Sequence, residues 1–181
     1  MKKSFLLFAA IAMSVSFSTA VMAQTSATVT GTAAGAKLIV PMTLTKTGSL
    51  HFGTINILAG AGGTVTLPSN SLTRSFSAGV SASAVALVAT HAAYDVTGTK
   101  HVTYALTLPE TITVTETLLG IATMSIGTLT ARFNGASIDA ITSTLSGSGT
   151  DNFTVGGVLT VPASAVGGIY AGTFNATVDY N

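Results

Sequence analysis

Residues 170–181 read YAGTFNATVDYN. Mostly apolar side chains occupy every second position, namely Tyr170, Gly172, Phe174, Ala176, Val178 and Tyr180. The positions between them are mostly polar, namely Ala171, Thr173, Asn175, Thr177, Asp179 and Asn181. Because successive side chains of a β-strand point to opposite faces, this period of two predicts one long strand with a buried face and a solvated face.

The same alternation recurs along the chain. It predicts further strands at residues 38–44, 50–52, 65–67, 102–108, 111–115 and 153–161. Gly156 and Gly157 allow a bend or a bulge in the last of these strands. Between Met124 and Phe133 the alternation slips at Gly127, which predicts a bulge or a short loop there.

The residue types between and within these segments favour a β fold. Threonine is frequent and alternates with Val, Ile, Leu and Ala, and threonine suits the half-exposed face of a sheet better than a helix. Glycines and prolines separate the segments at short intervals. We therefore expect an all-β fold, an antiparallel β-sandwich of immunoglobulin-like or pilin-like type with about 7–10 short strands. The Ala- and Ser-rich segment 75–90 fits either a weak strand or a short helix.

The charge and cysteine content exclude several classes of protein. Charged residues are 7% of the chain, and cysteine is absent. No basic patch is large enough to neutralise a row of phosphates, so no nucleic-acid partner is expected. Without cysteine there is neither a disulfide nor a thiolate metal site, so stability must come from apolar burial and backbone pairing.

The first residues have the pattern of a secretory signal peptide. Lys2 and Lys3 precede an apolar run over residues 5–17, and residues 21–23 (VMA) fit a cleavage site. We expect residues 1–23 to be removed on export. No later apolar run is long enough to cross a bilayer, so no transmembrane segment is expected in the mature chain. The expected location is extracellular, at the cell surface, or in the periplasm.

The expected mature chain has two parts, an N-terminal extension at residues 24–36 and a β-sandwich domain at residues 37–181. The extension has no charged and no large side chain, so it can form a strand but buries too little surface to fold alone. Such a segment lies on its own domain, stays frayed, or enters another subunit as an added strand. In the last case the candidate donor residues are Ala27, Val29, Gly31 and Ala33. The candidate acceptor residues on the C-terminal strand are Phe174, Ala176, Val178 and Tyr180.

The histidines are expected on the surface. His51 and His101 fall opposite apolar neighbours in their strands. His91, Asp95 and His101 are the minimum set for a metal site across a hairpin, but nothing in the sequence fixes them to face one another. We therefore expect no metal site and no cofactor.

The carboxylates give no sign of catalysis either. Glu110 and Glu116 flank the strand at residues 111–115. An acid–base pair needs a pocket that shifts its pKa, and no cluster of aromatic and charged residues indicates one. The protein is therefore not expected to be an enzyme.

A set of motifs covers most of residues 38–181 in order. The first are VP (40–41), LTKT (44–47), LHFG (50–53) and GGTVTL (62–67), and the next are YDVTG (94–98) and YALTLP (104–109). Met124 follows, and then FTVGGVLTV (153–161), GIYAGTF (168–174) and VDYN (178–181). Together these motifs resemble a bacterial exported family described as a domain of unknown function (number 4402).

The resemblance implies a secreted, cysteine-poor β-sandwich and carries no catalytic residues across. Members of this family are similar in size, architecture and C-terminal strand to the subunits of bacterial surface pili. The chain departs from the pilins of the chaperone–usher type because it lacks their usual disulfide pair.

Two functions are expected from these observations. The first is that of a structural protein, a subunit of a surface filament, pilus or adhesive layer that self-associates through β-strand addition, with a periplasmic chaperone as a further partner. The alternative is a monomeric secreted or periplasmic β-sandwich that binds a glycan or another protein.

Overall fold

The alternating segments form antiparallel strands in the computed structural model, which describes residues 28, 30–58, 60–85 and 87–181. Within these residues there is no helix, and the strands are β1 (Thr43–Gly48), β2 (Ile55–Ile57), β3 (Gly63–Leu67), β4 (Ser75–Phe76), β5 (Val80–Ala82), β6 (Ala92–Thr97), β7 (Thr103–Thr107), β8 (Thr111–Glu116), β9 (Thr123–Phe133), β10 (Thr142–Thr144), β11 (Thr150–Val161), β12 (Tyr170–Ala171) and β13 (Thr177–Tyr180). The all-β antiparallel prediction is confirmed, with more and shorter strands than expected. No helix in the described part of the chain is long and apolar enough to cross a bilayer.

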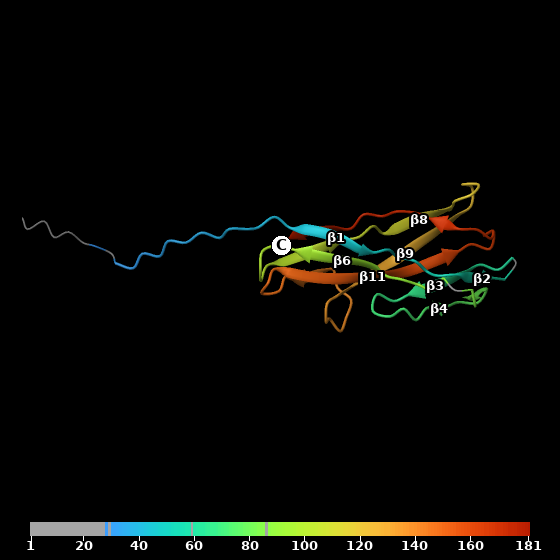
Figure 1. The fold of residues 1–181 in the computed structure, drawn as a ribbon, viewed down its shortest axis with the longest axis horizontal. Coiled ribbons are helices and arrows are strands. Elements are labelled where there is room, and N and C mark those ends of the chain that lie inside the picture. The colour runs from blue at the N-terminus through green and yellow to red at the C-terminus, as the bar shows by residue number, and fades with distance from the viewer. Residues whose placement is uncertain (1–27, 29, 59, 86) are drawn as a thin grey trace, which may run out of the picture. The chain divides into compact units, whose positions relative to one another are not determined.

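The largest sheet is organised around β11. Its strand order is β1-β6-β11-β9-β8-β12; β3 also pairs with β11, and β4 pairs with β3 (Figure 1). One edge of β11 pairs with β9 along most of its length, and the other edge pairs with β6 and then with β3. β11 therefore joins two successive partners, which explains its length of 12 residues.

A β-bulge interrupts the pairing of β9 with β11, as the slip at Gly127 predicted. Gly156 lies opposite Thr130, whereas Val158 lies opposite Gly127, so β9 has one residue more than β11 at this point. Thr128, within the extra stretch, has a positive φ of 47°. The bulge restores the alternation on both sides of it and keeps the apolar residues of β9 on one face.

A second, three-stranded sheet with the order β10-β7-β13 packs on part of the large sheet. Tyr104 of β7 contacts Phe133 of β9 edge-to-face, with ring centroids 5.7 Å apart. Phe133 in turn lies 5.4 Å from Phe153 of β11. These aromatic side chains belong to a buried group shared by the two sheets, which we call the β7-side cluster: Ala92, Tyr94, Val96, Tyr104, Leu106, Ala131, Phe133, Leu145, Phe153 and Val155. Two sheets with a common core form a sandwich.

A separate apolar group, the β3-side cluster, lies over the other half of the large sheet. Its buried members are Phe52, Val65, Leu67, Val80, Ala89, Ile112, Val114, Ile126, Leu159 and Val161. None of these residues belongs to β10, β7 or β13. The three-stranded sheet thus covers one half of the inner face, and short segments around β2 and β5 cover the other half.

The prediction of one long strand over residues 170–181 is wrong. β12 pairs with β8 in the large sheet, whereas β13 pairs with β7 in the three-stranded sheet, and residues 172–176 between them belong to no strand. A single strand cannot hydrogen-bond to both partners because they lie in different layers. The predicted alternation nevertheless holds from Phe174 to Tyr180, where every second residue is half-buried.

Two other segments differ from or refine the sequence prediction. The segment 75–90 contains β4 and β5, so the strand alternative is correct and the described part has no helix. The strand expected at residues 38–44 begins only at Thr43, and Leu38 and Val40 are exposed.

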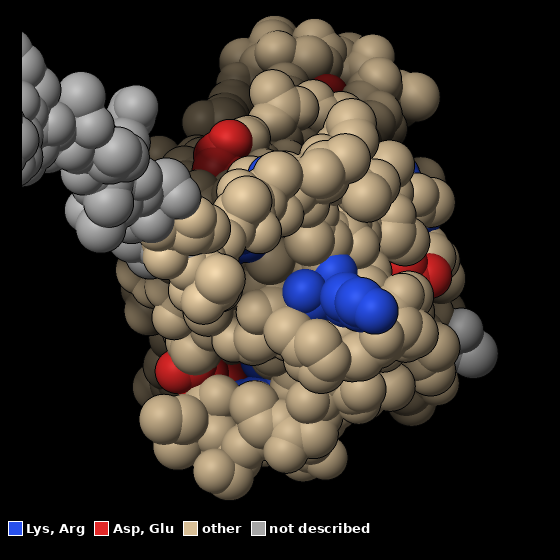
Figure 2. All heavy atoms as spheres, turned by 90° about the vertical axis from the view of Figure 1, so that its left-hand side faces the viewer, with Lys and Arg blue, Asp and Glu red and all other residues tan. Residues whose placement is uncertain are grey.

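The chain divides into residues 1–37 and a folded unit, Leu38–Asn181. The expected signal peptide, residues 1–23, lies outside the described residues. In the folded unit, uncharged side chains dominate the face seen in Figure 2, with a few charged ones of both signs among them.

Candidate functional site

An open groove with a volume of about 570 Å³ lies over the β3-side cluster. Its floor is the inner face of the large sheet and includes Ile112, Val114, Met124, Ile126, Leu159 and Val161. One side is formed by residues 48–55, here called the first wall, and the other by residues 168–174, the second wall. The buried floor residues are at most 8% exposed.

Hydrogen bonds to Thr90 and Arg74 attach the first wall to the rest of the domain. The His51 N–H donates to the Thr90 carbonyl at 2.9 Å, and the Thr90 N–H donates back to the His51 carbonyl at 2.8 Å. The guanidinium of Arg74 donates from Nη1 to the carbonyls of Phe52 (2.6 Å) and Thr54 (3.1 Å). Hydrogen bonds from a charged group are stronger than neutral ones, so Arg74 holds this wall firmly in place.

The second wall is seated closely on β8. A side chain at Gly172 would collide with the backbone carbonyl of Thr113, so only glycine permits this approach. Beyond β12, residues 172–176 belong to no strand, and no backbone hydrogen bond joins them to another described segment. Their N–H and C=O groups are therefore open to pairing with an added strand.

Glu116 fixes the β8–β9 turn, which lies beside the start of the second wall. Its carboxylate accepts hydrogen bonds from the N–H groups of Leu118 (2.9 Å) and Leu119 (2.6 Å). The Leu119 bond and then the Leu118 bond lower the pKa of Glu116, against the opposing effect of burial. Glu116 is thus a structural carboxylate, and its role was missed because a loop-capping contact has no signature in the alternation.

The groove is almost uncharged. Lys46 is the one residue with a permanent formal charge among those that line it. Tyr94 at the same end has its pKa raised by burial and so stays neutral. Apolar and backbone contacts, rather than ion pairs, would hold an occupant.

Among the described residues, one of the predicted acceptor residues and none of the predicted donor residues line the groove. Ala27 and Val29 lie outside the described residues, and Gly31 and Ala33 are exposed and belong to no strand. Of the predicted acceptor residues, Phe174 lines the groove. The other three, Ala176, Val178 and Tyr180, pack against the β7-side cluster instead.

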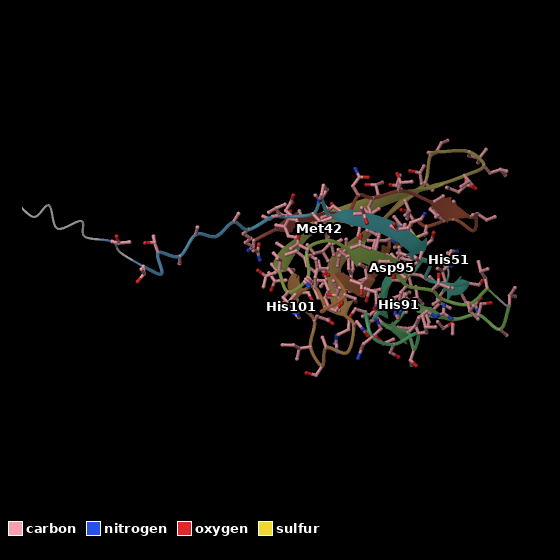
Figure 3. The ribbon with its side chains drawn as sticks, turned by 60° about the vertical axis from the view of Figure 1, so that its left-hand side comes forward. Met42, His51, His91, Asp95 and His101 are labelled. Carbon is pink, nitrogen blue, oxygen red and sulfur yellow. The ribbon has the colours of Figure 1, made fainter. Side chains whose placement is uncertain are left out.

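The histidines do not gather into one site. His51 and His101 are exposed, as expected, and His101 lies apart from His51 and His91 (Figure 3). The Nε2 atom of His91 lies 2.7 Å from the Pro68 carbonyl oxygen, a structural contact. Among the described residues, no group of three or more His, Asp or Glu side chains is arranged to hold a metal ion.

Two polar clusters outside the groove have their hydrogen bonds satisfied internally. In one, Asp151 accepts from the hydroxyls of Tyr104 (2.9 Å) and Ser143 (2.6 Å). In the other, Asp139 accepts from Ser69 (2.5 Å) and Arg132 (2.7 Å). Burial raises the pKa of Asp139, but the hydrogen bonds to its carboxylate outweigh that effect and lower it. Both clusters tie loops to the sheets.

Comparison with known proteins agrees with the motifs. No curated protein and no solved structure matches the chain. A family model described as "Domain of unknown function (DUF4402)" matches residues 42–180. This match covers most of the chain and includes both walls and the floor of the groove, so the protein belongs to this family of domains of unknown function.

Proposed function

We propose that the protein is a non-catalytic structural subunit of a surface filament or adhesive layer, assembled by β-strand addition. In this proposal residues 1–23 direct export, and the extension 24–36 of one subunit enters the groove of the next. A periplasmic chaperone that occupies the groove before assembly is a further partner in the proposal. No cofactor or metal takes part.

The observation that carries the proposal is the groove itself. The three-stranded sheet does not extend over the half of the inner face that carries the β3-side cluster, and residues 172–174 of the second wall make no backbone hydrogen bond to another described segment. An added strand would pair its backbone with that wall and direct alternate side chains to the floor.

The sequence of the extension fits this groove. The groove is almost uncharged, and the candidate donor residues are uncharged and small: Ala27, Val29, Gly31 and Ala33. The threonines between them would face solvent. Gly31 has a φ of 80°, so insertion as a regular strand requires a rotation at this residue, which glycine makes at little cost.

Insertion into a neighbour leads to a filament. The donor and the groove are different surfaces of one chain, so the contact is heterologous and leaves a free donor and a free groove at the two ends. Insertion into the same chain would instead give a monomer.

A pair of charge substitutions tests the proposal. Ala33→Asp places a carboxylate on the face that enters the apolar groove, and we expect it to abolish filaments. Thr32→Asp places the same charge on the outward face, and we expect it to leave filaments intact. Electron microscopy of cell surfaces and of the purified chain from Gln24 onward measures both outcomes.

A truncated chain provides the complementary measurement. If the chain Lys37–Asn181 still forms the filaments of the longer chain, or if Ala33→Asp and Thr32→Asp behave alike, the extension is not the donor.

A second candidate function is that of a monomeric binding module for a glycan or a protein segment. The groove volume of about 570 Å³ lies in the range of small-ligand sites, which supports this alternative. Dispersed monomers in the same microscopy experiment would favour it over the filament.

A further inference from the structure

The loops at one end of the folded unit expose an unusual number of large apolar side chains. We call this group the loop-end patch: Ile57, Leu58, Val85, Leu87, Val88, Leu118, Leu119, Ile121, Val166 and Ile169, which are 38–87% exposed. The segments that carry them are residues 57–62, 77–88, 117–122 and 162–169, and none contains Lys, Arg, Asp or Glu. An exposed apolar surface of this kind marks an interaction site.

Backbone hydrogen bonds join the loops of the patch in two pairs. The Thr117 N–H donates to the Ile169 carbonyl at 2.8 Å, which joins the β8–β9 turn to the loop before β12. The Leu58 N–H donates to the Gly79 carbonyl at 2.9 Å, which joins the segments 57–62 and 77–88. All these loops lie at the end of the domain away from the C-terminus (Figure 1).

The patch is continuous with the groove. Ile57, Leu87, Val166 and Ile169 line the groove and also belong to the patch. One mouth of the groove therefore opens onto the patch, whereas Lys46 lies towards the other end of the groove, beside β6.

A second apolar group follows the donor segment directly. Leu38, Ile39 and Val40 are 82%, 54% and 58% exposed. Ala33 is five residues before Leu38, a span of roughly 17 Å in an extended chain. When the donor fills the groove, these three side chains must emerge at one of its two mouths.

Granted the strand addition proposed above, we infer that Leu38–Val40 of the donating subunit pack on the loop-end patch of the accepting subunit. The donor then runs towards the patch, antiparallel to the second wall. Each subunit places its N-terminal apolar segment against the loop end of the next, so every junction in the filament buries both apolar groups. This second contact also orients successive subunits along the filament.

A lipid surface is the competing occupant of such a patch. Segments that bind at a bilayer interface usually carry Trp or Tyr and are flanked by Lys or Arg. The four loop segments contain none of these residue types. The composition therefore favours another copy of this chain.

Disulfide cross-linking tests the inference, because the natural chain has no cysteine and any bond formed reports a designed contact. We expect the chain with Ile39→Cys and Ile121→Cys to give a ladder of oligomers on oxidation. The matched control pairs Ile39→Cys with Ile141→Cys; Ile141 is also well exposed, at 69% against 82% for Ile121, but lies beside the three-stranded sheet. We expect no ladder from the control.

A double substitution provides a second measurement that does not depend on cysteine geometry. Leu118→Ser with Leu119→Ser removes two exposed side chains, so folding is not at risk. We expect filaments to need a subunit concentration about tenfold higher or more.

The outcomes separate this inference from the proposed function. The inference is overturned, and strand addition is not, if filaments form but two results are negative. The Ile39→Cys/Ile121→Cys chain then gives no ladder, and the serine variant forms filaments at the same subunit concentration as the unmodified chain. Absence of filaments from the unmodified chain overturns both. Flotation of the unmodified chain with phosphatidylcholine vesicles, lost in the serine variant, assigns the patch to a membrane and overturns the inference.

Discussion

At the residue scale, Glu116 shows how one buried carboxylate shapes the candidate site. It stands at the end of β8 and accepts hydrogen bonds from the turn that carries Leu118 and Leu119. The same carboxylate lies against Gly168, where a side chain would collide with it. Glu116 therefore positions both the β8–β9 turn and the start of the second wall.

The Glu116→Gln variant tests this role through its pH dependence. A carboxyl group whose pKa is lower in the folded chain than in the unfolded chain stabilises the fold above its ordinary pKa, and this stabilisation is lost as the pH falls through the folded value. We expect the variant to melt at a lower temperature than the natural chain at pH 7. The difference should shrink as the pH falls below about 4.

The matched control is Glu110→Gln, since Glu110 is exposed in the turn before β8. Its melting temperature should follow that of the natural chain at every pH. A difference for Glu116→Gln that stays constant with pH would mean that its charge does not matter.

At the element scale, β11 determines where the layers lie. It pairs with β6, β3 and β9. Residues 67–69 approach the middle of the strand so closely that glycine is required there. A side chain at Gly156 would collide with the backbone of residues 67–69. Gly127, on the partner strand, has its nearest neighbouring atom 3.6 Å from where a Cβ would lie.

Two alanine substitutions test this difference. We expect Gly156→Ala to destabilise the domain by about 1–3 kcal/mol, because the backbone of two segments must move. Gly127→Ala should change the free energy of unfolding by no more than about 1 kcal/mol, in either direction. Chemical denaturation measures both values. Equal losses of stability would show that β11 is not closely packed against residues 67–69 at Gly156.

At the scale of the whole molecule, the two layers differ in extent. The three-stranded sheet covers the β7-side cluster, and the groove remains over the β3-side cluster. Most globular proteins block an unpaired backbone edge with lysine or other charges, but residues 172–176 contain no charged side chain. The groove, the uncharged extension and the loop-end patch together favour head-to-tail association.

A synthetic peptide tests whether the groove accepts the extension. In the Ala33→Asp variant the groove is expected to stay empty, so a peptide of residues 24–36 should bind and stabilise it. At a concentration about 100 times its dissociation constant, the peptide should raise the melting temperature by roughly 5–10 °C. The same peptide with Ala33→Asp is the control, and an equal shift with both peptides would exclude a specific donor.

Much of the fold and part of the site follow from the sequence because their causes are local. The alternation of apolar and polar residues predicts β7, β8 and β11, the slip at Gly127 predicts the bulge, and the motifs identify the family. The exposed positions of His51 and His101 follow from the same alternation. A period of two, however, specifies which face of a strand is buried and not which strand lies beside it.

Only the tertiary structure decided how the C-terminal stretch divides between two sheets, and that Phe174 alone of the predicted acceptor residues lines the groove. The groove exists because the second layer is shorter than the first, and the loop-end patch exists because segments far apart in sequence end together. Both depend on pairings between distant strands. The sequence by itself determined a β-sheet protein with an uncharged extension; the long-range pairing, which no local pattern encodes, determined where the groove lies.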